Sequence, residues 1–251
     1  MAETLLTTTG ISRYFGGLAA VQDVSLELRR GELHAIVGPN GAGKSTFINL
    51  LSGDLLPSAG SVYYKGQNIS ALSMDRRSRL GIGRSYQKTN IFPSFTTFEN
   101  ARLAAQSREQ RPLWIFSIAL AYGPVRAAAE QALEHAGLSA RHDVVAAALS
   151  HGEQRQLEIA MVLATKPDVL LLDEPLAGMG AEESARMVKL LRELAADHAV
   201  MLVEHDMDAV FATADRITVM ANGQILESGS PNDIRESRAV RQVYLGEVTS
   251  P

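Results

Sequence analysis

The chain contains no cysteine, no apolar run long enough to cross a membrane and no excess of basic residues. Without cysteine it can form no disulfide, thiolate metal site or thiol nucleophile, which fits a reducing cytoplasm. The longest apolar run, residues 113–122, is shorter than the roughly 20 residues of a membrane-spanning helix. The net charge of −4 argues against nucleic acid as the main partner.

Length and composition predict an ordinary globular domain. The 251 residues are 46% hydrophobic and 21% charged, which is enough for a substantial core. The first ten residues, MAETLLTTTG, contain neither a basic region nor an apolar core, so we expect no secretory signal. We find no internal repeat and no low-complexity segment. If a membrane is involved, the chain lies beside it.

Residues 38–46, GPNGAGKST, match the phosphate-binding pattern G-x-x-x-x-G-K-[ST] at every fixed position. The apolar run 33–37 predicts a buried strand before this loop, and residues 46–51 predict a helix after it. Glycines allow the loop amides to point at phosphate oxygens, where the helix N-terminus adds positive charge. A glycine-rich turn that fits by chance would not explain the flanking strand and helix. The pattern therefore predicts a nucleoside triphosphate with Mg²⁺.

Each side chain of this loop has an expected role. Lys44 places a positive charge at the β- and γ-phosphates, and the Ser45 hydroxyl binds Mg²⁺. The residues predicted to bind the nucleotide are Gly38, Pro39, Asn40, Gly41, Ala42, Gly43, Lys44, Ser45 and Thr46.

The apolar run 169–172 ends in two acids, Asp173 and Glu174. A buried parallel strand delivers its carboxyl end to the ligand crevice of an α/β sheet. There we expect Asp173 to hold Mg²⁺ and Glu174 to orient or deprotonate an attacking water. Pro175 disfavours helical angles at Glu174, which keeps that carboxylate facing the site. A strand ending in solvated acids is the alternative, and the phosphate loop argues against it.

Further strands and helices follow from periodicity. Residues 21–28 and 61–64 alternate apolar and polar positions and predict an early antiparallel sheet. Residues 97–148 are alanine-rich with a helical period, and Gly137 is a plausible end for a helix over 127–135. The middle of the chain is therefore predicted to be a helical block.

The remaining third alternates strand and helix. The apolar runs 169–172 and 200–203, with an amphipathic helix over 182–196 between them, predict parallel strands joined by helices. Asn222-Gly223 predicts a hairpin between strands over 217–220 and 224–227. A short helical tail is expected after residue 230.

Residues 149–153, LSHGE, form a third informative segment, which we call the signature segment. Ser150 and Glu153 have the spacing of a capping box, which predicts a helix start whatever the function. A helix start carrying serine and glycine also presents an anion site. The segment lies at the end of the helical block, just before the acidic strand.

The phosphate loop, the signature segment, the acidic strand and His205 together resemble the ATPase subunit of an ABC transporter, over nearly the whole chain. The resemblance implies an α/β fold: a P-loop NTPase (RecA-like) core with an antiparallel β subdomain and an inserted helical subdomain. It implies a single ABC-type ATP-binding domain over residues 1–251, with the helical subdomain at about 90–160 and the tail at about 229–251.

In that family the signature segment usually reads LSGGQ and contacts the γ-phosphate held by the opposite subunit of a head-to-tail dimer. The resemblance assigns this contact to Ser150, His151, Gly152 and Glu153. His151 and Glu153 depart from the usual form, whereas the phosphate-facing serine and glycine are present. The capping role of Glu153 accounts for a carboxylate near phosphate.

Other positions carry over individually. Gln87 resembles the glutamine that senses Mg²⁺ and links the site to the membrane subunit, and His205 resembles the switch histidine at the γ-phosphate. Phe15 matches the aromatic that stacks on adenine, although a core aromatic is the alternative there. Gly180 stands where the family often has an aspartate, so contacts of that loop across the dimer are in doubt.

The segments 14–18, 84–100 and 225–247 resemble ATPases of branched-chain amino acid importers, whose relatives take urea, amides or aromatic acids. The resemblance implies a peripheral subunit on the cytoplasmic face of the inner membrane. Its expected partners are transmembrane permease subunits and a second ATPase, either identical or related, with a periplasmic solute-binding protein acting indirectly. We expect no nucleic-acid partner.

Three other interpretations fit parts of the sequence. Residues 165–168, TKPD, fit the guanine-reading pattern of GTPases, but they lie between a helix and a strand, so we expect a turn and a preference for ATP. A translation or DNA-maintenance ATPase would usually carry two ATPase units, coiled-coil insertions or zinc modules, none of which is seen here. A regulatory module that holds nucleotide without turnover would not need Glu174.

Overall fold

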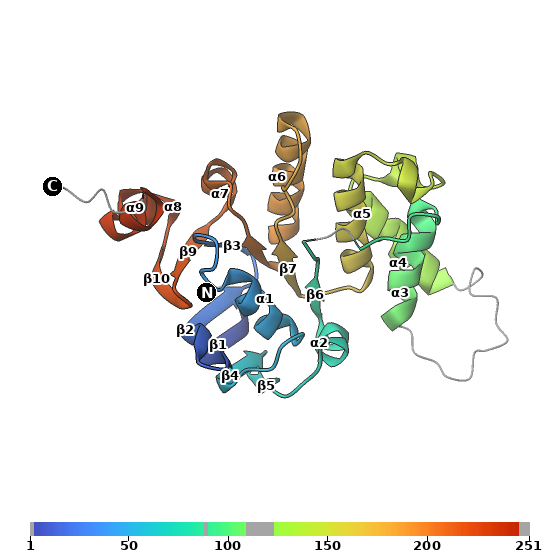
Figure 1. Cartoon of the computed structure of the whole chain (residues 1–251). Helices are drawn as coiled ribbons and strands as arrows, with labels where there is room; N and C mark the ends of the chain where they lie inside the picture. Colours follow the sequence, from blue (N-terminus) through green and yellow to red (C-terminus); the bar gives the residue numbers. More distant parts are fainter. Residues whose placement is uncertain (1–2, 88–89, 109–122, 246–251) are drawn as a thin grey trace.

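The structure is a computed structural model and describes residues 3–87, 90–108 and 123–245 (Figure 1). The apolar run 113–122, residues 88–89 and the end of the expected tail, residues 246–251, lie outside the described residues. The strands are β1 (Thr4–Phe15), β2 (Leu18–Arg29), β3 (Glu32–Val37), β4 (Ala59–Tyr64), β5 (Gln67–Asn68), β6 (Ile82–Arg84), β7 (Val169–Asp173), β8 (Ala199–Val203), β9 (Arg216–Ala221) and β10 (Gln224–Gly229). The helices are α1 (Lys44–Ser52), α2 (Met74–Leu80), α3 (Thr97–Arg108), α4 (Gly123–His135), α5 (His151–Ala164), α6 (Ala181–Ala195), α7 (Met207–Thr213), α8 (Pro231–Glu236) and α9 (Arg238–Leu245).

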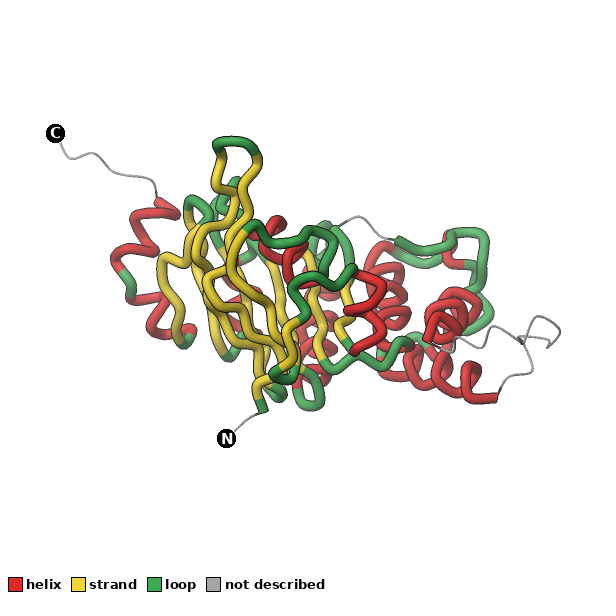
Figure 2. Tube along the Cα trace, turned by 90° about the horizontal axis from the view of Figure 1, so that it is seen from below, coloured by secondary structure: helices red, strands yellow, loops and turns green. Residues whose placement is uncertain are grey.

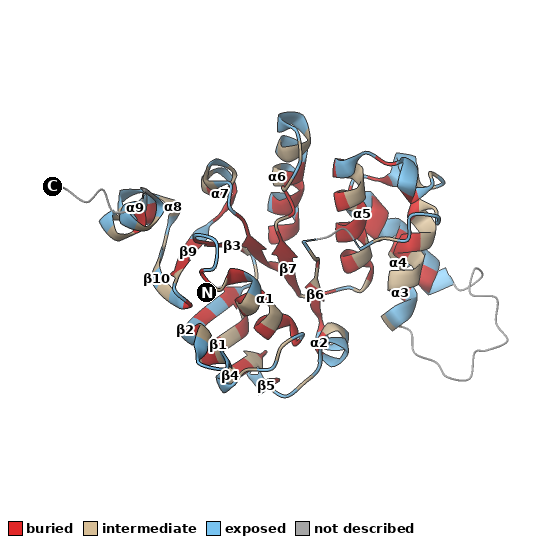
Figure 3. Ribbon diagram, viewed as in Figure 1, coloured by how far each residue is buried: buried red, intermediate tan, exposed pale blue. Residues whose placement is uncertain are grey.

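Six of the described strands form a central sheet in the order β10-β9-β3-β8-β7-β6. β3 pairs in parallel with β8 and β9, and β7 pairs in parallel with β6 and β8. β10 joins β9 as an antiparallel hairpin, as Asn222-Gly223 predicted. Every residue of β7 and β8 is buried, because layers cover both faces of a parallel sheet (Figure 3). The parallel pairing brings the ends of β3, β7 and β8 to the same edge.

A second, antiparallel sheet has the order β2-β1-β4-β5. It packs with α1 against one face of the central sheet, and Figure 2 shows its strands running beside those of the core. The sequence predicted β2 and β4, but it did not predict β1. In β1 the pairing register shifts between Thr8 and Ile11, where Gly10 has a φ of 56°, so the strand has no regular alternation to detect.

Helices α3, α4 and α5 pack together beside β6, at the right of Figure 1. As predicted, α4 ends before Gly137, which has a left-handed φ of 73°. One face of α5, with Leu157 and Ala160, belongs to this helical block, whereas Ile159 and Leu163 lie in the main core together with residues of α6. The boundaries of the helical subdomain therefore remain a prediction.

The C-terminal helices α8 and α9 lie beyond the hairpin, at the left of Figure 1, where the sequence predicted a helical tail. Among the described residues, no helix has the length and apolar character of a membrane span.

Arg77 closes the end of the helix that follows the phosphate loop. Its side chain is fully buried, and its Nη1 donates to the carbonyl oxygens of Leu50 at 2.7 Å and Leu51 at 2.9 Å. The other guanidinium nitrogens donate to the carbonyl oxygens of Leu72 at 3.1 Å and Ser70 at 3.0 Å. Burial lowers the pKa of Arg77 to about 10. These bonds satisfy carbonyls that the end of a helix leaves without partners.

We expect Arg77→Met to lower the free energy of unfolding by about 3 kcal/mol or more, because it leaves several buried carbonyls without donors. Urea denaturation of the full chain measures this. Arg76→Met is the control, since Arg76 is exposed on the same helix. Equal losses in the two variants would show that the buried bonds of Arg77 contribute nothing.

Asp168 joins the antiparallel sheet to the start of β7. Its carboxylate accepts hydrogen bonds from Tyr64 Oη at 2.5 Å, Lys65 Nζ at 2.8 Å and Arg30 Nη2 at 3.0 Å. Burial favours the neutral acid, but the bonds from Lys65, Tyr64 and Arg30 outweigh it and hold the pKa of Asp168 well below its usual range.

A carboxyl group with a depressed pKa stabilises the fold above its unfolded-state pKa and loses that contribution as the pH falls through its folded pKa. We therefore expect Asp168→Asn to be less stable than the parent by about 1–3 kcal/mol between pH 7 and pH 5. The difference should narrow below about pH 4. Denaturation curves across this range test it, with the exposed Asp197→Asn as control; a difference that stays constant to pH 3 contradicts the assignment.

Candidate nucleotide-binding site

The phosphate loop runs from the end of β3 to α1 and fits closely under neighbouring backbone. A Cβ placed on Gly38 would lie 2.2 Å from the carbonyl oxygen of Met220, and one on Gly43 would lie 2.4 Å from that of Ala20. Both glycines have positive φ angles, 151° and 99°. Only glycine can occupy these two positions without moving the surrounding strands.

Lys44 lies almost buried at the start of α1. Its Nζ donates to the carbonyl oxygens of Gly38 at 2.6 Å and Pro39 at 3.0 Å. Burial lowers the pKa of Lys44, whereas the nearby Glu174 and Asp173 act in the opposite direction. An ammonium group has three donors, so one remains for a phosphate oxygen.

A cavity of about 460 Å³ lies over this loop. Besides the loop, Gln87, Glu174 and the turn of the β9–β10 hairpin line this cavity. The lining residues are Leu18, Ala19, Ala20, Asn40, Gly41, Ala42, Gly43, Lys44, Ser45, Thr46, Gln87, Glu174, Asn222 and Gly223. The backbone amides of the loop, Lys44 and the hydroxyls of Ser45 and Thr46, with the carboxylate of Glu174 beside them, fit a triphosphate and a hard cation.

Asp173 stands at the end of β7 with a side chain that is only 8% exposed. Burial raises the pKa of Asp173, and the charge of Arg84, whose Nη2 lies 3.9 Å from Asp173 Oδ2, opposes that rise. The Ser85 Oγ accepts a 3.3 Å bond from the Asp173 amide. A buried carboxylate of this kind gains from a cation beside it.

Three of the predicted residues, Glu174, Gln87 and His205, lie next to one another. Gln87 Nε2 donates to Glu174 Oε2 at 3.0 Å, and His205 Nδ1 lies 3.9 Å from Glu174 Oε1. Glu174 has a left-handed φ of 50°, rather than the extended conformation usual before proline, and its amide donates to the Val203 carbonyl at 2.9 Å. Pro175 excludes a right-handed helical conformation, as expected, and this bond to β8 fixes the turn.

Two residues of α5 that were not predicted from the sequence hold the backbone at Gln87. From α5, Arg155 Nη1 donates to the Tyr86 carbonyl at 2.9 Å, and Glu158 Oε1 accepts a 2.9 Å bond from the Tyr86 amide. Arg155 Nη2 also donates to the Gln87 carbonyl. Arg155 and Glu158 are themselves joined at 3.0 Å and are both nearly buried. The sequence could have indicated this pair, because Arg155 and Glu158 are oppositely charged and lie three residues apart on a helix whose residues beside Glu158 are apolar.

Glu204 is a second missed residue, and its side chain is 1% exposed. Its Oε1 accepts a 2.9 Å bond from the Leu176 amide and its Oε2 accepts a 3.2 Å bond from the His205 amide. Burial raises the pKa of Glu204, and these two amides oppose the rise. Glu204 thus ties the loop after Glu174 to the loop that carries His205. Its place directly after a buried strand was the available signal.

We expect Glu204→Gln to lower ATP turnover by about tenfold or more while changing ATP affinity little, because one of its two amide bonds is lost and the loops of Glu174 and His205 shift. Steady-state hydrolysis and equilibrium ATP binding measure the two effects. Glu193→Gln, on the exposed face of α6, is the control. A loss confined to affinity would contradict this positioning role.

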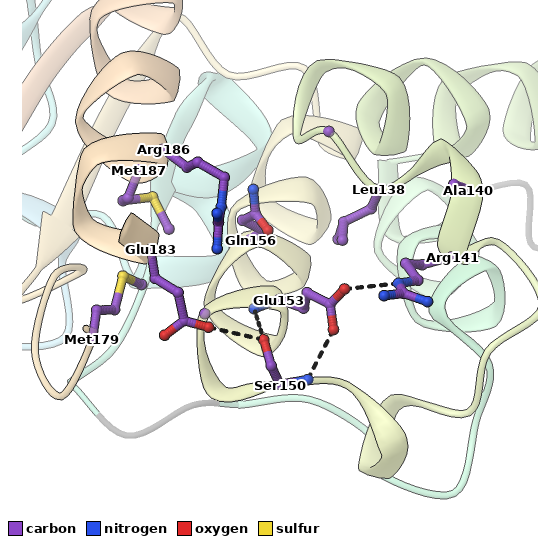
Figure 4. A pocket seen from close by; sticks show the side chains of 12 residues that line it. Leu138, Ala140, Arg141, Ser150, Glu153, Gln156, Met179, Glu183, Arg186 and Met187 are labelled. Atoms are coloured by element: carbon purple, nitrogen blue, oxygen red, sulfur yellow. Dashed lines mark hydrogen bonds and ion pairs between the residues drawn. The ribbon is translucent and has the colours of Figure 1, made fainter. Parts of the chain in front are cut away.

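The signature segment caps α5 as predicted. The Ser150 Oγ accepts a 3.2 Å bond from the Glu153 amide, and Glu153 Oε2 accepts a 2.9 Å bond from the Ser150 amide. That backbone bond, together with Arg141 Nε at 2.7 Å from Glu153 Oε1, lowers the pKa of Glu153 (Figure 4). The negative charge that departs from the usual signature is therefore compensated within the chain.

Ser150, Gly152 and Glu153 line a separate cavity of about 790 Å³, between α5 and α6 (Figure 4). None of the residues around it lines the cavity of the phosphate loop. His151 lies beside the loop after Glu174, since a Cβ placed on Gly178 would be 3.3 Å from His151 Cε1. Within one chain, the signature segment and the phosphate loop therefore lie apart.

Several residues singled out from the sequence do not line the cavity over the phosphate loop, namely Phe15, Gly38, Pro39, Asp168, Asp173 and His205. Phe15 is 45% exposed, with the Arg13 guanidinium 4.8 Å from its ring centroid, and it does not line that cavity. Asp168 lies at the opposite end of β7 from Asp173 and is bound by Arg30, Tyr64 and Lys65. As expected, α5 ends at Ala164 and a turn follows, so nothing here supports guanine recognition.

A phosphate loop, its helix and an acid-terminated parallel strand define a nucleotide-binding α/β protein of the P-loop class. The chain belongs to the ABC transporter family, whose model, described as ABC transporter, matches residues 21–177.

Relatives and solved structures agree with this assignment. The chain is 37% identical to the high-affinity branched-chain amino acid transport ATP-binding protein LivG of Escherichia coli (strain K12), over 98% of this chain and 100% of the relative. It is 35% identical to BraF of Pseudomonas aeruginosa, which has the same description, over 98% of this chain and 100% of that protein.

Among solved structures, the ADP conformation of MJ1267, an ATP-binding cassette of an ABC transporter, is 30% identical. It superposes with a TM-score of 0.87 over 97% of this chain and 99% of that chain. A nucleotide-free cassette from an ABC transporter gives a TM-score of 0.87 at 29% identity, over 97% and 100% of the two chains. These matches confirm the predicted P-loop fold and the predicted ABC transporter ATPase.

Proposed function

We propose that this ATPase binds ATP with Mg²⁺ and drives the import of a branched-chain amino acid, or a related small polar or amide solute, through a membrane permease. LivG and BraF, which support this solute class, are aligned over their full lengths. The observation that carries the catalytic role is the cluster of Gln87, Glu174 and His205 beside the phosphate loop.

The loop residues and Lys44 bind the triphosphate. They line the same cavity, and both the remaining N–H donor of Lys44 and the loop amides can donate hydrogen bonds to phosphate oxygens there. Ser45 and Asp173 would hold Mg²⁺, with Gln87 beside them. A cation bound there would neutralise negative charge on the phosphates. Phe15 would stack on the base from outside the cavity edge.

Hydrolysis needs a base next to the γ-phosphate. Glu174 takes a proton from water, the water oxygen forms a bond to the γ-phosphorus, and the bond from that phosphorus to the leaving ADP oxygen breaks. Gln87 holds Glu174 by a 3.0 Å hydrogen bond, and His205 lies on its other oxygen. The products are ADP and inorganic phosphate.

The signature segment acts on the ATP of a partner subunit. The separation of the two cavities in one chain supports this, because Ser150 and Gly152 line a different cavity from the phosphate loop of their own subunit. A related cassette, MJ0796, has been solved as a dimer, with 25% identity to this chain and a TM-score of 0.76. We propose a head-to-tail dimer, with itself or with a related ATPase, bound to permease subunits at the cytoplasmic face of the membrane.

Affinity purification of the chain from native membranes in mild detergent tests the transporter role. Co-purification of multi-span permeases, with or without a second ATPase, supports it. The periplasmic solute-binding protein of the same system then identifies the solute by its ligand. Recovery of only ribosomal or DNA-associated partners would contradict transport and leave the ATPase site unaffected.

We expect Glu174→Gln to bind ATP but to lower its turnover by about 100-fold or more, because the amide cannot accept the proton from water. The variant should accumulate an ATP-bound dimer. Phosphate release and light scattering with ATP measure both effects. Glu193→Gln, an exposed change on α6, controls for the loss of one carboxylate, and full turnover in Glu174→Gln would refute the base assignment.

A further inference from the structure

Glu183, in the first turn of α6, lies directly over the signature segment. Ser150 Oγ donates a 3.0 Å hydrogen bond to Glu183 Oε1, and Figure 4 shows the two side chains facing each other. A Cβ placed on Gly152 would lie 2.7 Å from the same Glu183 oxygen. The carboxylate therefore covers both residues that the proposed function assigns to phosphate.

The hydroxyl of Ser150 cannot serve two acceptors at once. A serine hydroxyl has one donor. The Ser150 oxygen already accepts the capping bond from the Glu153 amide, and its proton goes to Glu183. A phosphate oxygen also needs that proton, and its negative charge is repelled by a carboxylate at this distance.

The neighbouring carboxylates are arranged differently. Glu153 is held by Arg141 at 2.7 Å. Glu182 precedes Glu183 in the same helical turn, but its side chain is 95% exposed and lies 3.9 Å from Arg186. Of these three carboxylates, only that of Glu183 accepts a hydrogen bond from the Ser150 hydroxyl.

We propose that Glu183 is a positioning residue that holds the Ser150 hydroxyl within its own subunit and must release it before the signature segment engages the γ-phosphate of the partner. The inference rests on the proposed function, which assigns Ser150 to that phosphate. The contact opposes closure of the dimer until ATP is bound, and it sets the ATP concentration at which closure occurs.

The test uses the full chain carrying Glu174→Gln, with ATP-dependent dimer formation followed by sedimentation velocity. Adding Glu183→Ala should lower the ATP concentration for half-maximal dimer by about threefold to tenfold, the range expected for removal of one competing hydrogen bond. Glu182→Ala removes the same charge from the same turn of α6 and should change it little. An unchanged or raised ATP requirement in Glu183→Ala would overturn the inference.

Ser150→Ala separates this inference from the proposed function. If Ser150→Ala leaves the ATP dependence of the dimer unchanged, or if ATP produces no dimer, the proposed role of the signature segment fails. If Ser150→Ala weakens the dimer and Glu183→Ala does not tighten it, only the inference fails. In the presence of Ser150→Ala, the effect of Glu183→Ala should become smaller, because only the repulsion between the Glu183 carboxylate and the phosphate remains to be removed.

A second measurement needs no dimer. Without nucleotide, Glu183→Ala should lower the Tm of the chain, and this shift should vanish when Ser150→Ala is already present. Glu182→Ala should give the same Tm shift in both backgrounds. Additive Tm shifts for Ser150→Ala and Glu183→Ala would show that the contact between the two residues does not stabilise the fold, and would overturn the inference.

Discussion

The site depends on carboxylates that stand where two wholly buried strands end. Because every residue of β7 and β8 is buried, Asp173 and Glu204 have little access to water, and burial raises the pKa of both. Fixed donors make their charges tolerable: backbone amides at Glu204, and Arg84 and Lys44 near Asp173. The amides that bind Glu204 belong to the loops after β7 and β8. The hydrogen bonds that stabilise this buried carboxylate therefore also fix the loops that carry Glu174 and His205.

Helix α5 connects the two halves of this arrangement. Its N-terminus carries Ser150, its second turn carries Arg155 and Glu158, and its last turns are packed in the main core. Arg155 and Glu158 hold the backbone of Tyr86 and Gln87, and Gln87 in turn binds Glu174. One continuous helix therefore carries both Ser150 and the two residues that hold the backbone beside the hydrogen bond on Glu174. The nearly buried ion pair is the fixed point of this link, since breaking it would leave an uncompensated charge.

The fold and the centre of the site could be predicted because their signals are local. The phosphate loop, the acids after 169–172, the capping box at Ser150 and the Asn222-Gly223 hairpin each lie within a few adjacent residues. Glu204, Arg84, Arg155 and Glu183 were missed because their roles come from contacts with segments far away in the sequence. Gly10 concealed β1 for a related reason, since a bulge removes the alternation by which a strand is detected. The assignments of Phe15 and of the subdomain boundaries stay predictions.

The structure shows the contacts of the two departures from the usual signature, His151 and Glu153, and the position of Gly180 in the loop before α6. Glu153 is bound to Arg141, His151 lies against the loop at Gly178, and Gly180 begins α6 without a capping side chain. The first turn of α6 lies next to the signature segment, which is where Glu183 meets Ser150. Glu153, His151 and Glu183 thus each contact another part of the same subunit. The proposed closure of the dimer would exchange the bond from Ser150 to Glu183 for a bond from Ser150 to phosphate, so part of the free energy of ATP binding would be used to break a contact within the subunit.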